Sequence, residues 1–415
     1  MTSSDDFDRD VAEILRRPEV WRSDAGPLPV PAAILAIAAL SSRLIAEDDA
    51  ASERLDEIDK TPPVWWRTAI AKTPERNTAG LVRQLLERMR SFLVKAPLQA
   101  LECTAIAVDV ANAIAVTAYP GDFVISLRAD AWRDHAYVLS FLGRSHEAIA
   151  AVDRAEQLLG QIPLPEFQAA RTKLVRANIY RVTDRLAEAV GLAHEAGETF
   201  LAFGERSRYL NARTTEAMLL HEIGRVRDAL VIWETIKDDQ AMLETTHVQV
   251  VYDMGLAHRE LGDLQKSTEL ITQSIAEYDL LGMDVEATRA RWGLASTLVA
   301  AGRLSDAVPM LETAWKKFES FAIESDAALV ALELAEVLLV VGQPERVPHI
   351  CRELLDRFTR LGMTSRAITA LSYLREVVAM GKAQPPIVRH VREFLRDLPL
   401  DGRSQLLLSP DDCSR

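Results

Sequence analysis

The chain has 415 residues, of which 48% are hydrophobic, and this is enough apolar material for a continuous core. Its formal net charge is −13, so general attraction to nucleic acid or to an anionic membrane is unfavourable, and we expect neither as a partner. The cysteines Cys103, Cys351 and Cys413 are scattered and odd in number, and the start MTSSDDFDRD is acidic where an export signal would be basic. We therefore expect a cytoplasmic protein without a disulfide framework.

Residues 1–60 are predicted to form an N-terminal helical region, because apolar residues recur there at helical spacing. One stripe consists of Phe7, Val11, Ile14 and Leu15. The apolar run 28–40 that follows is too short to cross a membrane and favours a buried helix.

Residues 61–122 are predicted to form a helical hairpin, with helices at 78–94 and 97–115. One interpretation of this hairpin is a degenerate first repeat. Trp65 and Trp66 precede Arg67 and further cations, and a nucleic-acid site would stack bases on such aromatics. The acidic balance of the chain favours a different interpretation, in which the tryptophans pack the hairpin and the cations are solvated.

A glycine then returns at a nearly constant interval, which predicts an array of about six stacked repeats over residues 123–383. The glycines are Gly143, Gly224, Gly262, Gly302 and Gly342, and Asp184 fills the missing place. A small residue precedes each of these positions by seven residues: Ala136, Ala177, Ala217, Gly255, Ala295 and Ala335. A second small residue follows by five in Ala148, Ala189, Ala229, Ser267 and Ala307, with Val347 the larger last member. Small side chains at fixed points on consecutive helices predict tightly packed helical hairpins with the glycine at the turn.

After the array, residues 384–399 are predicted to form an amphipathic helix that caps its open end, because terminal repeats need one face covered. Its apolar stripe consists of Val388, Val391, Leu395 and Leu398. Residues 400–415 are expected to be a tail.

The pattern resembles the tetratricopeptide repeat (TPR), which has a small residue on its first helix, a glycine at the turn and alanines on its second helix. Trp132, Ala136, Gly143, Ala148 and Ala155 match that order. The usual TPR period is about 34 residues, whereas the interval here is longer, as in kinesin-light-chain-like and bacterial regulatory TPR proteins. The resemblance implies an all-α, right-handed TPR-type solenoid.

By the same resemblance, the first helix of each hairpin lines a concave groove with exposed positions at fixed distances before the turn. In this chain those positions hold Arg133, Tyr137, Arg171, Asn178, Arg181, Asn211, Met218, His221, Gln249, Tyr252, Arg259, Arg289, Trp292 and Ser296. Arginine, amide and aromatic side chains suit a peptide of acidic character. An equally weighted alternative is that several of them pair with acidic neighbours such as Asp130, Glu222 and Glu260.

Motifs for catalysis, metals or cofactors do not emerge from the sequence, so we expect none of the three. His146, His194 and His221 each precede a glutamate, but the second histidine of the zinc-protease motif is missing. Glycine-rich phosphate loops and GxSxG elbows are also missing.

The sequence thus predicts a non-enzymatic scaffold that binds a peptide segment of a protein partner in its groove. A bacterial regulatory or signalling role, such as holding a sigma factor or an effector, fits by analogy. One alternative is a regulator that senses a peptide or small ligand, and another is a hydrolase with its site in the N-terminal region. The sequence leaves the oligomeric state open.

Overall fold

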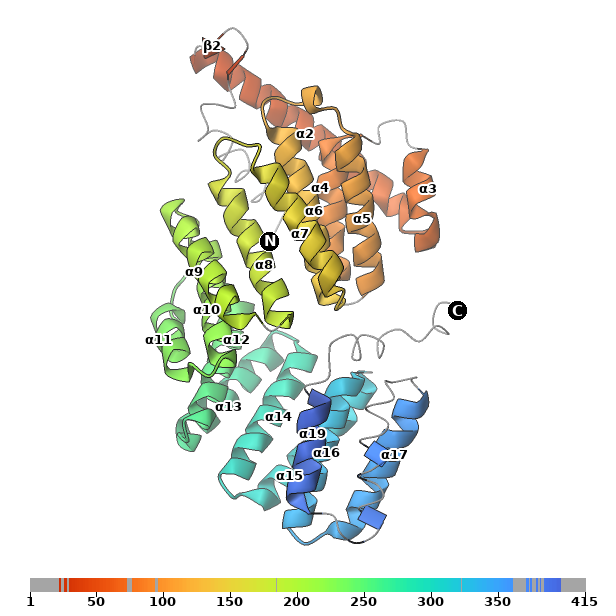
Figure 1. Cartoon of the computed structure of the whole chain (residues 1–415), viewed down its shortest axis with the longest axis vertical. Helices are drawn as coiled ribbons and strands as arrows, with labels where there is room; N and C mark the ends of the chain where they lie inside the picture. The colour runs from red at the N-terminus through yellow and green to blue at the C-terminus, as the bar shows by residue number, and fades with distance from the viewer. Residues whose placement is uncertain are drawn as a thin grey trace. The chain divides into compact units, whose positions relative to one another are not determined.

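The chain folds into a succession of α-helices, which Figure 1 shows for the computed structural model. The structure describes residues 22–23, 26–27, 30–72, 77–93, 96–183, 185–321, 323–360, 371–372, 374, 378–379, 381 and 384–396. The predicted stripe from Phe7 to Leu15, Leu398 and the predicted tail lie outside these residues, as do Asp184 and Cys413. The chain divides into two compact units, Met1–Arg185 and Leu186–Arg415. The division falls inside the predicted array.

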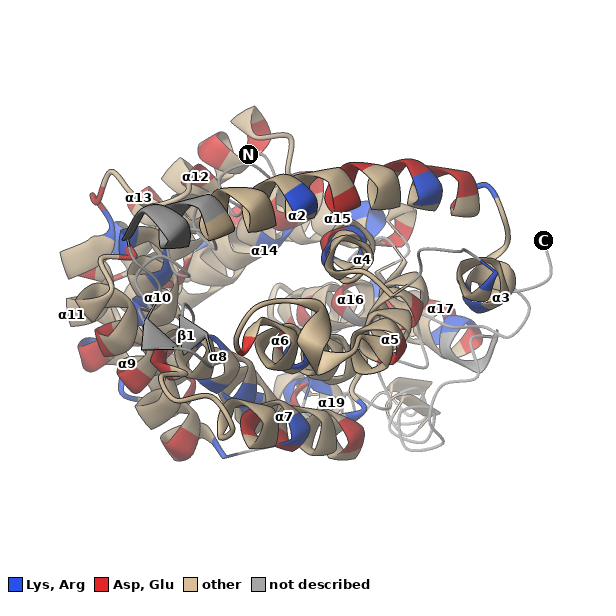
Figure 2. Ribbon diagram, turned by 90° about the horizontal axis from the view of Figure 1, so that it is seen from above, with Lys and Arg blue, Asp and Glu red and all other residues tan. Residues whose placement is uncertain are grey.

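The first described elements of the first unit are two antiparallel strands of two residues each, β1 (Arg22–Ser23) and β2 (Gly26–Pro27). Its helices are α2 (Val30–Ile58), α3 (Trp66–Ala71), α4 (Ala79–Phe92), α5 (Pro97–Ala113), α6 (Phe123–Phe141), α7 (Ser145–Leu159) and α8 (Glu166–Val182), with short 3-10 turns at Pro63–Trp65 and Val116–Ala118. α2 contains the predicted apolar run from residue 30 onward, and its charged residues gather in its C-terminal half (Figure 2). The helices α4 and α5 form the hairpin predicted for residues 78–115.

α2 and α4 cross at Gly80, where the backbones come so close that a Cβ atom would overlap the main chain of Glu47 and Asp48. The Glu47 carboxylate accepts hydrogen bonds from the Gly80 N–H at 3.2 Å and from the Tyr119 hydroxyl at 2.6 Å. The guanidinium of Arg43 lies 4.0 Å from the centre of the Tyr119 ring. A carboxylate at the N-terminus of a helix is favoured by the helix dipole, so Glu47 joins α2, α4 and the segment before α6.

The two neighbouring tryptophans have different environments. Trp66 is buried, donates its indole N–H to the Thr61 carbonyl at 3.1 Å and lies 5.9 Å from the Phe92 ring. Trp65 is 58% exposed, so the predicted packing role holds only for Trp66. Arg67 is exposed as expected, although it forms ion pairs with two acidic residues of α5. The expectation of solvated cations is wrong for Arg88, whose side chain is 17% exposed and pairs with Asp56 and Asp59.

The second unit consists of helical hairpins. Its described helices are α9 (Leu186–Ala202), α10 (Arg206–Glu222), α11 (Val226–Ile236), α12 (Glu244–Glu260), α13 (Leu264–Leu280), α14 (Asp284–Ala300), α15 (Leu304–Ser320), α16 (Glu324–Val340), α17 (Val347–Arg360) and α19 (Pro385–Arg396), with a 3-10 turn at Pro344–Arg346. The even-numbered helices α10 to α16 precede a turn glycine, and we call them the first helices of their hairpins.

The recurring glycines form the turns of the hairpins, as predicted. Gly143, Gly224, Gly262, Gly302 and Gly342 all have φ between 73° and 82°, in the left-handed region where side chains with a Cβ atom are strained. At the turn after α14, the Gly302 N–H binds the Val299 carbonyl at 3.0 Å and the Arg303 N–H binds the Leu298 carbonyl at 2.9 Å. These bonds satisfy carbonyl groups that the helix end would leave unpaired.

The predicted small residues lie where the helices of a hairpin touch. Ala295 of α14 and Ala307 of α15 are both 0% exposed. Gly255 of α12 leaves even less room, because a Cβ atom there would come within 2.6 Å of the Ile271 side chain on α13. Small residues therefore set the closest approach of the helices, and larger side chains fill the space on either side.

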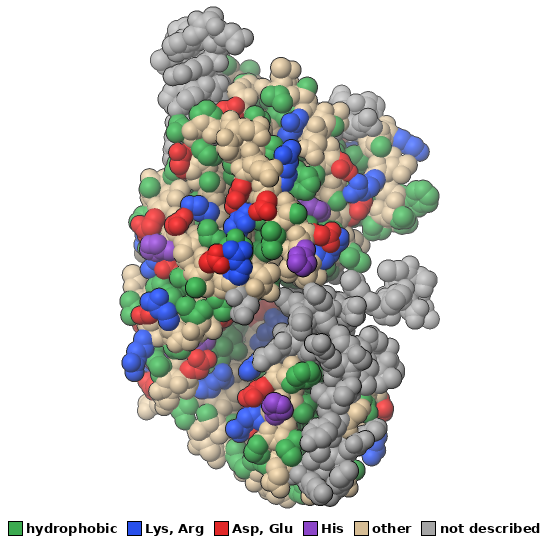
Figure 3. Space-filling view, viewed as in Figure 1, with side chains coloured by type: hydrophobic (Ala, Val, Ile, Leu, Met, Phe, Trp, Pro, Cys, Tyr) green, Lys and Arg blue, Asp and Glu red, His purple; other side chains and the backbone are tan. Residues whose placement is uncertain are grey.

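The surface carries charges of both signs. On the face shown in Figure 3, acidic and basic side chains are interspersed, without a broad patch of one sign among the described residues. Within the described part of the chain, no helix is long and apolar enough to cross a membrane.

We predict that Ala295→Leu and Ala307→Leu each lower the free energy of unfolding by about 1–3 kcal/mol, because the added atoms overpack a helix contact that has no free space. Ala300→Leu, at an exposed position of α14, is the matched control and should leave stability within about 0.5 kcal/mol. Urea unfolding followed by circular dichroism measures the effect. Equal stability of all three variants would mean that the helices do not pack at these residues.

Candidate functional site

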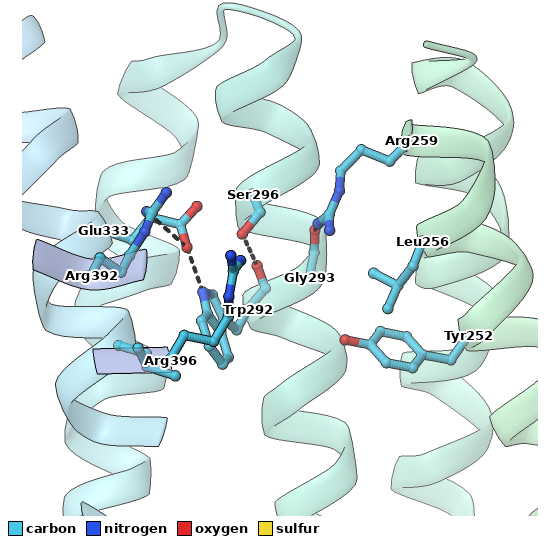
Figure 4. Close-up of a pocket in the computed structure, with 10 residues that line it drawn as sticks. Tyr252, Leu256, Arg259, Trp292, Gly293, Ser296, Glu333, Arg392 and Arg396 are labelled. Carbon is cyan, nitrogen blue, oxygen red and sulfur yellow. Dashed lines mark hydrogen bonds and ion pairs between the residues drawn. The ribbon is translucent and has the colours of Figure 1, made fainter. Parts of the chain in front are cut away.

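The second unit contains a pocket of about 370 Å³, bounded by three successive first helices and by α19. Figure 4 shows the residues that line it: Tyr252, Leu256 and Arg259 of α12, Trp292, Gly293 and Ser296 of α14, Leu329 and Glu333 of α16, and Arg392 and Arg396 of α19. The volume is at the lower end of the range for ligand pockets, about 300–1,000 Å³. The pocket thus suits a small ligand or a few residues of a peptide.

Aromatic side chains form the apolar part of the pocket. The Trp292 ring lies edge-on to buried Phe318, with 6.2 Å between ring centres. Tyr252 packs against the backbone of α14 at Gly293, where a Cβ atom would lie 2.9 Å from the tyrosine oxygen and 3.0 Å from Cε2. Glycine at position 293 therefore lets the hydroxyl end of the Tyr252 ring approach the backbone of the neighbouring helix.

The Tyr252 hydroxyl remains a hydrogen-bond donor at neutral pH. It donates to the Arg289 carbonyl oxygen at 3.3 Å, and burial raises its pKa well above the ordinary value. The Ser296 hydroxyl donates to the Trp292 carbonyl at 3.2 Å. The pocket thus presents two neutral hydroxyl groups beside its aromatic walls.

Two buried glutamates of α16 hold α19 in place. Glu333 and Glu336 are 8% and 7% exposed, and such carboxylates need partners because burial removes their hydration. Glu333 accepts the Trp292 indole N–H at 2.7 Å and lies 3.5 Å from Arg392. Glu336 pairs with Arg389 at 2.5 Å and with Arg392 at 3.2 Å.

The lining of the pocket has a local excess of positive charge, although the chain is acidic. It contains the guanidinium groups of Arg259, Arg392 and Arg396 and the single carboxylate of Glu333. Arg259 donates to a neutral group, the Gly293 carbonyl, at 3.3 Å. Charges in a recess interact through a lower effective dielectric than charges on an open surface, so this excess favours an anionic ligand.

Comparisons with known proteins show the fold. No family model matches the sequence, and no curated protein sequence matches it. Among solved structures, the apo form of RapI superimposes with a TM-score of 0.55 at 12% identity, covering 86% of this chain and 99% of that one. A Rap protein complexed with Competence and Sporulation Factor has a TM-score of 0.51 at 13% identity, covering 86% and 99%. The apo form of the quorum sensor NprR from B. thuringiensis has a TM-score of 0.51 at 12% identity, covering 82% and 99%.

These proteins are helical solenoids of TPR-like repeats. The chain has the TPR fold. This confirms the predicted all-α, TPR-type fold class, which the resemblance of the glycine and alanine positions had implied.

Four of the residues predicted for the TPR groove meet in the pocket: Tyr252, Arg259, Trp292 and Ser296. Tyr252 and Trp292 occupy corresponding positions of two successive TPR motifs, and Arg259 and Ser296 lie on the same two helices, so the stacking of α12 and α14 brings all four together. Arg289 is beside the pocket, where its exposed side chain pairs with Asp326 at 2.8 Å.

Further predicted residues of α10 and α12 lie elsewhere in the second unit. Gln249 donates to Asp253 at 2.9 Å and accepts from Tyr278 at 3.0 Å, so it organises the contact of α12 with α13. His221 is 3.1 Å from the Glu260 carboxylate. On α10, Asn211 is exposed and Met218 packs against a buried cluster.

In the first unit, the expectation that Arg133 is exposed is wrong. Its side chain is 5% exposed and forms ion pairs with Asp130 and Asp134 on the same helix. The alternative of pairing with acidic neighbours on the same helix therefore holds for Arg133, because Asp130 is one helical turn before it. Arg171 reaches the same carboxylate from α8, at 3.4 Å.

The other predicted groove residues of the first unit are half-buried. They are Tyr137, Asn178 and Arg181. Burial raises the pKa of Tyr137, and the Asn178 amide donates to the Leu174 carbonyl of its own helix at 3.2 Å.

The groove positions projected from the sequence stop at the fifth repeat, so they leave out Glu333, Glu336 and the arginines of α19. Two signals point to these residues. Glutamates interrupt the apolar run of α16, and Arg389, Arg392 and Arg396 recur at helical spacing beside the apolar stripe of α19. α19, the helix expected to cap the array, lies against α16, the first helix of the hairpin that contains Gly342.

The described residues offer neither a metal site nor a reactive cysteine. Within the described part of the chain, no group of three or more His, Cys, Asp and Glu side chains could hold a metal ion. Burial raises the pKa of Cys103 to about 12 and that of Cys351 to about 11, so both thiols stay protonated at neutral pH and react slowly.

We predict that Gly293→Ala is at least about 1 kcal/mol less favourable than Gly191→Ala. Both changes replace glycine by alanine inside a helix, which by itself raises the free energy of unfolding by about 0.5–1 kcal/mol. A Cβ atom at Gly191 meets no atom within 4 Å, whereas one at Gly293 displaces the Tyr252 ring. Urea unfolding midpoints measure the difference, and equal gains in the two variants would show that Tyr252 does not pack on Gly293.

Proposed function

We propose that this protein is a non-catalytic TPR scaffold that holds a peptide segment of a protein partner in the pocket between α12, α14, α16 and α19. The single observation that carries the proposal is the meeting of predicted groove residues from two successive repeats in one pocket. Repeats of this kind bind along their first helices, and aromatic and arginine side chains are the anchors that peptide sites commonly use. The positive lining favours a segment of acidic character.

The setting we propose is bacterial and cytoplasmic, in regulation or signalling, where a scaffold could hold an effector or a sigma factor. The structural comparisons support a regulatory role, because NprR is named a quorum sensor and the Rap protein was solved with Competence and Sporulation Factor. They also make a sensor of a peptide or small ligand the second candidate. A pocket of about 370 Å³ has room for a small ligand or a few residues of a free peptide, so a sensor would not need a protein partner.

A hydrolase in the N-terminal region is less well supported. The Thr104 hydroxyl is 2.9 Å from Nδ1 of His135, which is the arrangement of a nucleophile and its base. Thr104 is 0% exposed, however, so a substrate cannot reach its oxygen. Burial also lowers the pKa of His135, which fits a histidine enclosed in a core.

We predict that a photoreactive benzoylphenylalanine at position 256 will cross-link the partner in cells that produce the protein. Leu256 lines the pocket, whereas Leu280 on α13 is 87% exposed outside it and is the control position. Mass spectrometry of the adducts distinguishes a protein partner from a short peptide, and so separates the scaffold from the sensor.

The adduct at position 256 should also disappear when Tyr252→Ala removes one wall of the pocket. Adducts that form at position 280 alone, or equally at both positions, would mean that the partner uses the second helices, and the proposed function would be wrong.

A further inference from the structure

The arrangement of arginines in the pocket raises an electrostatic problem. In Figure 4, Arg259 reaches toward α14 from α12, and Arg396 reaches toward the same helix from α19 on the opposite side. The lining contains the guanidinium groups of Arg259, Arg392 and Arg396 and the carboxylate of Glu333, so arginines outnumber carboxylates there. Like charges that converge in a recess repel each other, and a bound anion removes that repulsion.

The carboxylate in the lining is already engaged. Glu333 receives the Trp292 indole N–H at 2.7 Å and is paired with Arg392 at 3.5 Å. Glu336, beside the pocket, is shared between Arg389 and Arg392. The carboxylates of α16 therefore serve to dock α19, and they do not offset the charge that Arg259 adds from α12.

We propose that Arg259, Arg392 and Arg396 form a carboxylate subsite, which recognises an acidic group of the bound peptide and clamps α19 onto α16. This inference rests on the proposed function, because it names the chemistry that the pocket selects. Planar guanidinium groups match the two oxygens of a carboxylate, and the aromatic walls of Trp292 and Tyr252 accept an apolar neighbour of that group.

The proposed clamping of α19 follows from the helices to which the three arginines belong. Arg259 belongs to α12, whereas Arg392 and Arg396 belong to α19, which is held by its buried residues Val388, Val391 and Leu395. An anion that bridges the two helices binds only when α19 is docked. Binding must then stabilise the docked state of α19, and docking must raise the affinity for the anion by the same factor.

Three acetylated tetrapeptides test the subsite on the full-length protein. The first, Ac-Ala-Leu-Glu-Leu-amide, has a side-chain carboxylate. The second, Ac-Ala-Leu-Gln-Leu-amide, is neutral, and the third is the same glutamine peptide with a free terminal carboxylate. Titration calorimetry should show at least one acidic form binding about tenfold to a hundredfold more tightly than the neutral peptide, as hydrogen bonds to charged groups do.

The acidic form that binds more tightly identifies the source of the carboxylate as a side chain or a chain end. Equal binding of all three peptides, including no measurable binding of any, would overturn the subsite.

Arg259→Gln and Arg396→Gln should each abolish the preference for the acidic peptide. Arg303→Gln is the matched control, because Arg303 is an exposed turn arginine that pairs with Asp306 away from the pocket, and it should keep the preference. Circular dichroism confirms that each variant is folded. A preference that persists in both pocket variants would show that other groups bind the carboxylate.

Hydrogen exchange tests the clamp separately. At ten times its dissociation constant, the acidic peptide should slow exchange in residues 385–396 by about tenfold in the wild-type protein. In Arg259→Gln, where α19 itself is unaltered, that protection should disappear. Unchanged exchange in the wild-type protein with the acidic peptide bound would show that the anion does not bridge the two helices.

Failure of the subsite and failure of the proposed function give different results. A partner that cross-links at position 256 and binds wild-type protein, Arg259→Gln and Arg396→Gln equally would leave the scaffold function intact and remove the subsite. An acidic peptide that binds through these arginines, without any partner cross-linking at position 256, would keep the subsite and remove the scaffold function.

Discussion

The close approach of paired helices at small residues is the constraint on which the rest of the second unit depends. Ala295 and Ala307 are fully buried, and at Gly255 even a methyl group would overlap Ile271. Each hairpin can therefore pack in only one register, which determines the side chains that its first helix leaves for the pocket. Tyr252 and Trp292 owe their shared location to this packing, since they are far apart in sequence and have equivalent places in successive repeats.

Polar contacts then add specificity to this apolar framework. Buried ion pairs contribute little net stability, because the loss of hydration offsets most of their attraction. The pairs of Glu333 and Glu336 with the arginines of α19 are better understood as a registration device, since α19 satisfies both carboxylates only when it lies at one place on α16. Glu47 has a comparable role in the first unit, where it connects α2 to the start of α4 and to Tyr119.

The candidate site was partly predictable from the sequence. Tyr252, Arg259, Trp292 and Ser296 follow from counting back from the turn glycines, because every repeat presents the same positions to the same side. Arg133 shows the limit of that counting. Its place in the repeat is equivalent to a groove position, yet Asp130 and Asp134 draw its side chain into ion pairs along its own helix. The position in the repeat determines where the backbone of a residue lies, and the neighbouring side chains determine where its charged group lies.

The sequence by itself determined the helical hairpins, the glycine turns and the small residues at the helix contacts, because these are set by interactions within about one repeat length. The tertiary structure alone decided where α19 packs and how the pocket closes. Arg389 and Glu336 are 53 residues apart and belong to no repeating pattern, so no periodicity relates them. The charge of the pocket has the same origin, since it arises from arginines that become neighbours only when a helix outside the array folds back onto it.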